Sequence, residues 1–179
     1  MSHINIEIKA RCSNLEKVRK LLLKEGAVFI GLDHQVDTYF KVNQGRLKLR
    51  EGNIENHLIY YERPDQEGPK GSNVTLYKPS DTKVIKDMLS KANGVLTIVN
   101  KAREIFFIGN VKFHLDLVKG LGSFMEIEAI GDDESGKNKL QEQCEHYMEL
   151  FGIRSSELIS SSYSDMLLRQ DAKDHPFAI

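Results

Sequence analysis

The sequence contains few cysteines and no tryptophan, and it has no long apolar segment. Cys12 and Cys144 lie far apart without any CxxC spacing, which indicates neither a zinc site nor a redox pair. We therefore expect two free thiols and a cytoplasmic location. No apolar run approaches the roughly 18 residues that a membrane span needs. Residues 1–3 lead directly into a strand pattern, so we expect neither a signal peptide nor a membrane partner.

The chain also lacks a net charge of any size. Its 25 Lys and Arg residues stand against 26 Asp and Glu residues, which gives a formal net charge of −1. This balance does not favour a nucleic acid polymer as a partner. The apolar share of 40% and the charged share of 28% are ordinary for a globular protein. We expect a single domain over residues 1–170 and a loosely ordered tail over residues 171–179.

Two kinds of hydrophobic periodicity alternate along the chain. Residues 4–11 alternate apolar and polar side chains, which predicts a strand with one packed face. Further strands are predicted over residues 35–42, 46–51, 57–63, 73–78, 95–109, 111–118 and 124–130. Helical spacing predicts helices over residues 14–25, 81–92, 136–151 and 161–169. This order of elements indicates an α+β fold with an antiparallel sheet.

Two segments carry more specific expectations. The segment 64–72 contains two prolines and two glycines, so we expect a mobile loop there and no central strand. Apolar residues share one face of the predicted helix 81–92, and we expect this face to be buried. The residues are Val84, Ile85, Met88 and Leu89.

Charged side chains share one face of several predicted strands, because residues i, i+2 and i+4 of a strand point to the same side. The first strand carries Asn5, Glu7, Lys9 and Arg11 on its polar side. The corresponding residues of later strands are Arg46, Lys48 and Arg50; Lys101 and Arg103; Lys112, His114 and Asp116; and Glu126 and Glu128. These positions are almost entirely ionisable, and both signs recur within single strands.

Two arrangements would explain these charged faces. In the first, they are the solvent faces of a one-sided sheet, and periodicity alone favours this interpretation because most antiparallel sheets are built so. In the second, the sheet closes into a barrel, and the apolar faces point outward under the helices. The charged faces would then line a lumen in which opposite charges and bound ions compensate one another.

Such a lumen would suit a polyanion accompanied by metal ions. A triphosphate carries about four negative charges, so its site needs several basic groups, and arginine contacts phosphate oxygens in a bidentate manner. Carboxylates beside the bases could hold Mg²⁺ or Mn²⁺. The candidate bases are Lys9, Arg11, Lys48, Arg50, Arg63, Lys101 and Arg103, and the candidate carboxylates are Glu7, Glu126 and Glu128.

An ordered series of short segments adds a resemblance to this pattern. Asn-Ile-Glu-Ile-Lys-Ala-Arg at 5–11 is similar to the ExExK signature that opens the CYTH family, the triphosphate tunnel metalloenzymes. Leu-Lys-Leu-Arg-Glu at 47–51, the bases Arg63, Lys101 and Arg103, the segment 116–128 and the segment 162–167 follow in the family's order. The resemblance spans residues 4 to about 168. The Gly-Leu-Gly-x-Phe-x-Glu-Ile stretch within 116–128 most resembles the branch of class IV adenylyl cyclases.

The resemblance implies a closed eight-stranded antiparallel β-barrel with helices packed outside. It also implies metal binding by Glu7 and Glu126, with Glu128 and Asp116 assisting, and a catalytic set of Glu7, Lys9 and Glu126. The phosphate-contacting positions that it implies are Lys9, Arg50, Arg63, Lys101 and Arg103. Two positions depart from the family pattern. Asn5 replaces the first signature acid, which puts a second metal site in doubt, and Arg63 stands where such cyclases often have lysine.

The function that follows is a Mg²⁺- or Mn²⁺-dependent enzyme acting on a small-molecule triphosphate. An adenylyl cyclase-like reaction, from ATP to cyclic AMP and pyrophosphate, is favoured. The alternatives are a triphosphatase for thiamine triphosphate or inorganic triphosphate, and a non-catalytic module that binds polyphosphate or nucleotide. A homodimer is compatible with the chain. We expect His114 to serve as a structural hydrogen-bonding residue, and Tyr39, Tyr60, Tyr61 and Tyr77 to pack in the core.

Overall fold

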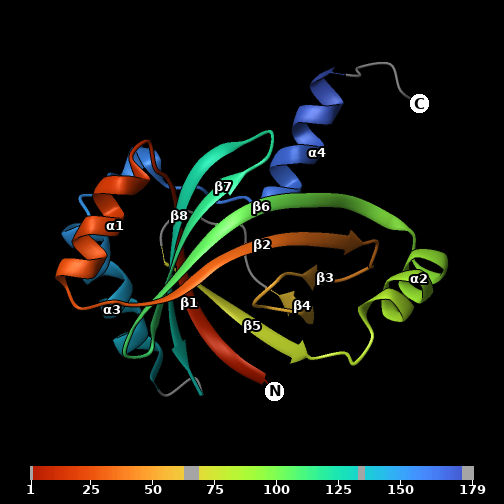
Figure 1. Ribbon diagram of the computed structural model, residues 1–179, viewed down its shortest axis with the longest axis horizontal. Coiled ribbons are helices and arrows are strands. Elements are labelled where there is room, and N and C mark those ends of the chain that lie inside the picture. Colours follow the sequence, from red (N-terminus) through yellow and green to blue (C-terminus); the bar gives the residue numbers. More distant parts are fainter. Residues whose placement is uncertain (1, 63–68, 133–135, 175–179) are drawn as a thin grey trace.

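The computed structural model describes residues 2–62, 69–132 and 136–174 (Figure 1). Eight strands and four helices follow one another along these residues. They are β1 (Ser2–Arg11), α1 (Leu15–Lys24), β2 (Val28–Phe40), β3 (Arg46–Glu51), β4 (His57–Glu62), β5 (Lys70–Tyr77), α2 (Thr82–Ala92), β6 (Val95–Ile108), β7 (Val111–Val118), β8 (Gly122–Gly131), α3 (Lys137–Leu150) and α4 (Tyr163–Asp174). A short 3₁₀ turn, Ser155–Glu157, precedes α4.

The strands form one closed antiparallel barrel in the order β1-β5-β4-β3-β2-β6-β7-β8. The ring closes where β8 pairs with β1, with Ile4 opposite Gly131 and Arg11 opposite Phe124. Closure removes most of the unpaired sheet edge, and Leu158 and Ile159 outside the barrel pair with the end of β1 at Ala10 and Lys9. The predicted α+β fold with a closed eight-stranded barrel is confirmed.

The main apolar core lies outside this barrel, under α1 and α3 (Figure 1). The outward faces of β1, β7 and β8 supply Ile8, Phe113 and Ile127, which are almost fully buried. Helix residues such as Leu22 and Leu140 pack against them. The apolar halves of these alternating strands therefore face the helices, which leaves the polar halves to face the barrel interior. Both cysteines are free, as predicted.

Two predicted boundaries differ from the structure because strand pairing extends past the sequence signals. β2 begins at Val28, before the predicted residue 35, and passes a register shift between Phe29 and Gly31. β5 begins at Lys70, inside the segment 64–72 that we expected to be a loop, because residues 70–72 pair with Glu7 and its neighbours on β1. The remainder of that predicted loop lies largely outside the described residues.

The structure also differs from the expectations for α2 and for the C-terminal tail. No residue of α2 is buried, and Val84 and Met88 are 53% and 60% exposed. The reason is position: α2 lies at one end of the barrel beside β2 and β3, away from α1 and α3 (Figure 1). The expected loose tail begins too early, because α4 continues to Asp174. No helix among the described residues is both long and apolar enough to cross a membrane.

Candidate active site

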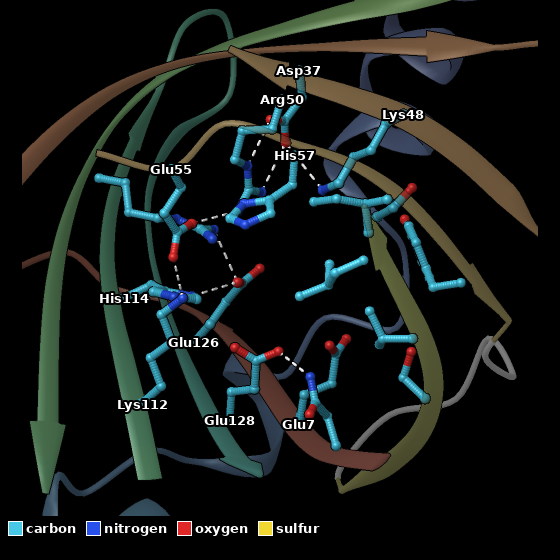
Figure 2. A pocket seen from close by; sticks show the side chains of 18 of the residues that line it. Glu7, Asp37, Lys48, Arg50, Glu55, His57, Lys112, His114, Glu126 and Glu128 are labelled. Atoms are coloured by element: carbon cyan, nitrogen blue, oxygen red, sulfur yellow. Dashed lines mark hydrogen bonds and ion pairs between the residues drawn. The ribbon is translucent and has the colours of Figure 1, made fainter. Parts of the chain in front are cut away.

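The charged strand faces line an internal cavity of about 240 Å³ (Figure 2). Lys9, Lys101 and Arg103 line this cavity and are only 5%, 3% and 3% exposed. Side chains with such low exposure cannot belong to the solvent face of an open sheet. The interpretation that periodicity alone favoured is therefore wrong, and the lumen interpretation is confirmed.

Opposite charges almost cancel along the described lining. Six basic residues, Lys9, Lys48, Arg50, Lys101, Arg103 and Lys112, face five acidic residues, Glu7, Asp37, Glu55, Glu126 and Glu128. With both lining histidines neutral, the excess is one positive charge. Buried charges need such partners because desolvation of an isolated ion costs far more than folding can supply.

Asp37 on β2 gathers the bases on one side of the cavity. Its carboxylate accepts hydrogen bonds from Arg50 Nε at 2.8 Å and Nη2 at 3.0 Å, from Lys48 Nζ at 3.0 Å and from Lys101 Nζ at 2.7 Å. Burial alone would raise the pKa of Asp37, but Arg50 and Lys101 outweigh it and hold that pKa well below its usual range. Burial lowers the pKa of Lys101 to about 7, although Asp37 acts in the opposite direction. The charge of Lys101 can therefore change near neutral pH.

Glu126 on β8 binds two further bases, Lys9 and Arg103. Lys9 Nζ lies 3.0 Å and Arg103 Nη2 lies 2.9 Å from its carboxylate oxygens. His114 Nδ1 lies 3.1 Å from Glu126 Oε2 (Figure 2). Burial would raise the pKa of Glu126, yet the charges of Lys9 and Arg103 keep it well below its usual range. Burial lowers the pKa of His114, so its imidazole is neutral at pH 7. Glu126 is therefore an anion held by two cations and a neutral histidine.

Asp116, one of the predicted metal ligands, lies in the wall beneath the cavity surface. Arg103 donates to its two oxygens from Nε at 2.7 Å and Nη2 at 2.5 Å, and the Tyr163 hydroxyl donates to Oδ2 at 2.8 Å. The Asp116 side chain is fully buried. This arrangement makes Asp116 a support that fixes the guanidinium of Arg103.

The donors best placed for a divalent cation lie across the β1–β8 pair. Glu7 and Glu128 are direct partners in the register, and Asn5 Nδ2 donates to Glu128 Oε1 (Figure 2). Carboxylate and amide oxygens of this kind are ligands that Mg²⁺ and Mn²⁺ prefer. Asn5 Oδ1 is buried and has no hydrogen-bond partner among the described residues. No group of three or more His, Cys, Asp or Glu residues in the described part of the chain is arranged around a metal position.

The structure brings most of the predicted site residues together, but not all of them. Eight line the cavity: Glu7, Lys9, Lys48, Arg50, Lys101, Arg103, Glu126 and Glu128. Arg11 does not line the cavity and is exposed. Its Nη1 lies 3.5 Å from Leu121 O, and its guanidinium lies over the Phe124 ring. Arg63 lies outside the described residues.

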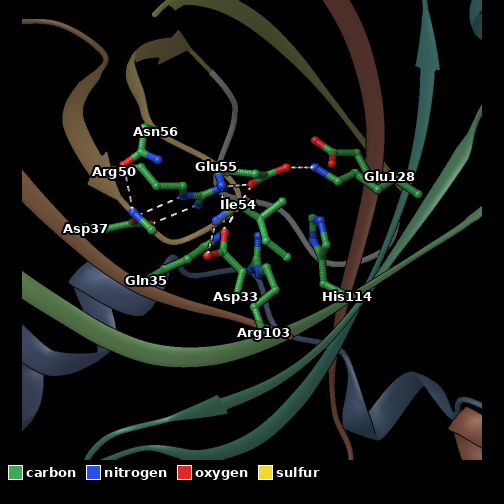
Figure 3. A network of polar contacts seen from close by, with 12 residues as sticks. Asp33, Gln35, Asp37, Arg50, Ile54, Glu55, Asn56, Arg103, His114 and Glu128 are labelled. Carbon is green, nitrogen blue, oxygen red and sulfur yellow. Dashed lines mark hydrogen bonds and ion pairs between the residues drawn. The ribbon is translucent and has the colours of Figure 1, made fainter. Parts of the chain in front are cut away.

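Glu55 is the main lining residue that sequence reasoning missed. It reaches the cavity from the loop between β3 and β4, where Asp33 accepts hydrogen bonds from the backbone N–H groups of Ile54 at 2.9 Å and Glu55 at 3.0 Å (Figure 3). The Glu55 carboxylate binds Arg50 Nη1 at 2.8 Å and pairs with Lys112 Nζ. Burial would raise the pKa of Glu55, but Arg50 and Lys112 lower it strongly. Strand alternation places Lys112 on the same face as His114 and so predicts that it lines the cavity. Glu55 lies in a loop, where no alternating pattern shows which way its side chain points.

Of the tyrosines expected in the core, Tyr39 and Tyr61 are buried in apolar clusters, as predicted, whereas Tyr77 is not. Tyr39 and Tyr61 line the cavity, and Lys48 Nζ lies 3.3 Å from the Tyr39 hydroxyl. On the outer surface, Tyr77 is 57% exposed. Tyr163, at the start of α4, also lines the cavity, and Lys9 Nζ lies 4.0 Å from its ring centroid. Aromatic rings and charged groups thus share the interior.

Comparisons with known proteins agree with this architecture. Over 172 residues the chain is 25% identical to the "Putative adenylate cyclase MJ0240" of Methanocaldococcus jannaschii, which covers 91% of this chain and 98% of the relative. The PH1012 protein of Pyrococcus horikoshii has a solved structure with a TM-score of 0.78 and 24% identity, covering 90% of this chain and 98% of its own.

A plant structure has the same fold at a lower level of similarity. It is the Hippeastrum HpAC1 protein, described as a putative adenylyl cyclase with a dominant triphosphatase activity, with a TM-score of 0.63 and 14% identity over 95% of this chain and 96% of its own. The CYTH domain family matches residues 3–163, which include every strand of the barrel and its lining. The chain therefore belongs to the CYTH domain family.

Proposed function

We propose that this protein binds an organic triphosphate together with Mg²⁺ or Mn²⁺ in the barrel cavity and breaks a phosphoanhydride bond in an adenylyl cyclase-like reaction. The observation that carries the proposal is the convergence of Lys9, Lys101 and Arg103 with carboxylates in one buried cavity. The name of the Methanocaldococcus relative supports the cyclase assignment. Family membership supports an enzyme of this general kind.

The charge of the cavity supports the metal requirement. Its described lining has a formal excess of one positive charge, whereas a triphosphate brings about four negative charges. Divalent cations that enter with the substrate would supply the difference. Glu7, Glu128 and Asn5 Oδ1, which has no partner within the described part of the chain, are hard oxygen donors of the kind that Mg²⁺ and Mn²⁺ prefer, so the residues fit such an ion. When bound, the ion would neutralise charge on phosphate oxygens.

The basic residues would orient the phosphates. Phosphate oxygens would take the place of Glu126 as the partner of Lys9 and Arg103. Glu7 and Glu126 are the carboxylates that would hold the metal ion. Asp116 keeps Arg103 in place through two hydrogen bonds, so the guanidinium is presented without a further loss of side-chain entropy. Burial strengthens these contacts relative to the same contacts in water.

Two reactions are compatible with this arrangement. In the cyclase reaction, the 3′-hydroxyl of the nucleotide attacks the α-phosphate and pyrophosphate leaves. In the triphosphatase reaction, water attacks the terminal phosphate and orthophosphate leaves. The second is the runner-up because the Hippeastrum structure with the same fold is described as having a dominant triphosphatase activity. Thiamine triphosphate and inorganic triphosphate are its candidate substrates.

Product analysis separates these reactions. The purified chain would be incubated with ATP, thiamine triphosphate or inorganic triphosphate, each with Mg²⁺, Mn²⁺ or EDTA. Cyclic AMP, pyrophosphate and orthophosphate would then be quantified. We expect metal-dependent formation of cyclic AMP and pyrophosphate in equal amounts from ATP. Orthophosphate as the main product would select the triphosphatase, and no turnover of any substrate would contradict the enzyme proposal.

A third candidate is a binding module without catalysis, and Asn5 is the observation that favours it. An amide in place of the first signature acid supplies an oxygen donor without charge, which weakens any metal site that depends on it. Calorimetry distinguishes this candidate. Triphosphate binding that requires metal but yields no product would select the binding module.

A further inference from the structure

The strands β4 and β5 present an apolar surface to the cavity. Their inward residues are Ile59, Tyr61, Val74 and Leu76, which we name the apolar wall. Ile59, Tyr61 and Val74 are 7%, 8% and 9% exposed, and the four side chains form one packed cluster. The outward neighbour Thr75 is exposed. The inward face of this pair is therefore mainly apolar, whereas the inward faces of β1 and β8 are charged.

This wall differs from an ordinary protein core in what it faces. A core cluster packs against another apolar layer, whereas these residues line the same cavity as Lys9 and Arg103. Ile59 pairs with Leu76 and Tyr61 pairs with Val74 across the β4–β5 ladder, which makes the wall continuous. The cavity thus has one charged side and one apolar side, and a ligand bound in it would contact both.

The two sides set different requirements on a ligand. A phosphate group against these apolar side chains would lose its hydration, and Lys48, whose Nζ lies 5.7 Å from the centroid of the Tyr61 ring, is already bound to Asp37. Tyr61 does not supply a charge, because burial raises its pKa well above the usual value. An apolar or aromatic group against the same wall would instead gain free energy in proportion to the surface that it buries. The cavity is therefore suited to a ligand with an anionic end and an apolar or aromatic end.

We infer that the apolar wall is a specificity-determining subsite, which holds the organic group of the triphosphate and discriminates against inorganic triphosphate. This inference rests on the proposed function and adds to it the place of the organic group. Inorganic triphosphate can contact the basic residues and the metal ion, but it has no apolar group to bury against the apolar wall. An organic triphosphate with a flat heterocycle covers both sides at once, with its phosphates at Lys9 and Arg103 and its ring at Val74 and Tyr61.

Binding measurements without turnover test the subsite. The ligands are the bis-methylene analogues of ATP and of inorganic triphosphate, in which carbon replaces the two cleavable bridging oxygens. Calorimetry with Mg²⁺ gives both dissociation constants for the wild type, Val74→Thr and Ile59→Ala. Val74→Thr keeps the shape of the side chain but places a hydroxyl on the wall. Thr75→Val, the reverse exchange on the outward face of β5, is the matched control.

We expect the wall variants to weaken the ATP analogue by about 5- to 20-fold and the inorganic analogue by less than about 2-fold. The control should change neither constant. Circular dichroism melts show whether each variant is folded, and Val74→Thr remains informative if Ile59→Ala unfolds. An unchanged ratio of the two constants in a folded variant would overturn the subsite and leave the proposed function intact. Failure of the wild type to bind either analogue would overturn the proposed function, and the subsite with it.

Discussion

The two halves of the barrel differ in which face of each strand is apolar. On β1, β7 and β8 the apolar residues point outward to α1 and α3, and charged residues point inward. On β4 and β5 the inward residues Ile59, Tyr61, Val74 and Leu76 are apolar, while outward residues such as Asn73 and Thr75 are exposed. Where α1 and α3 cover the strands, the outer face is apolar and the charged residues face inward. The cavity is therefore two-sided.

The largest effect should come from the charged half, at Glu126. We expect Glu126→Gln to reduce metal-dependent turnover by about 100-fold or more, since the amide cannot balance Lys9 and Arg103 or serve as an anionic metal ligand. Initial rates of product formation at saturating metal measure this loss. The exposed Glu142→Gln on α3 is the matched control. Unchanged turnover in a folded Glu126→Gln variant would remove this glutamate from the site.

The next residue along β8 should separate stability from chemistry. Ile127 points outward into the core under the helices and is fully buried. We expect Ile127→Ala to lower the free energy of unfolding by about 2–5 kcal/mol, because it removes buried methyl groups and leaves a cavity. Denaturant titration measures the loss, and KM for the triphosphate should stay within about 2-fold of the wild type. A large change in KM would mean that the outer core and the lining are not independent.

Glu55 offers a way to change the charge balance of the lining. Its carboxylate occupies Arg50 and Lys112, two bases that could otherwise contact phosphate. We expect Glu55→Gln to tighten binding of the bis-methylene analogue of inorganic triphosphate by about 3- to 10-fold. The loop should stay in place, because Asp33 holds it through backbone N–H groups that the substitution does not touch.

Calorimetry of the variant and the wild type measures this change. Glu51→Gln is the control, since Glu51 pairs with Lys86 of α2 outside the cavity. Weaker binding by Glu55→Gln would show that Glu55 positions Arg50 and Lys112 instead of competing for them. In that case the near-neutral lining would not limit affinity.

The charged half could be predicted from the sequence, whereas much of the apolar half could not. Alternation along β1, β6 and β8 indicates which residues share a face, so Lys9, Arg103 and Glu126 were identified together. Arg11 obeys the same alternation but lies one step beyond the cavity, and periodicity does not reveal where a lumen ends. Glu55 enters from a turn, where neither period applies.

Apolar alternation has a similar ambiguity on the other half. The pattern of β4 and β5 predicts one apolar face, but it does not say whether that face meets a helix, another sheet or a cavity. The exposed Val84 and Met88 of α2 show the same limitation for a helix. An amphipathic pattern specifies a face, and only the tertiary arrangement specifies what that face contacts.

The smallest predicted effect is a proton taken up when a triphosphate binds to the charged half. Burial lowers the pKa of Lys101 to about 7, so at pH 8 this amine is mostly neutral. A bound polyanion favours the charged amine and raises that pKa, so binding at pH 8 should take up as much as about one proton. At pH 6 Lys101 is already charged, and the uptake should vanish.

Calorimetry in buffers of different ionisation enthalpy measures this uptake, with the bis-methylene ATP analogue as the ligand. Lys101→Arg is the control, because a guanidinium stays charged at both pH values and cannot take up a proton. The lowered pKa of Lys101 also determines how this group changes the folding stability with pH. Between about pH 7 and pH 10 the unfolded lysine holds a proton that the folded lysine lacks, so this group makes folding more favourable as the pH rises. Equal uptake by the wild type and Lys101→Arg would place the titrating group elsewhere, and the charged half would then bind phosphate with its bases already protonated.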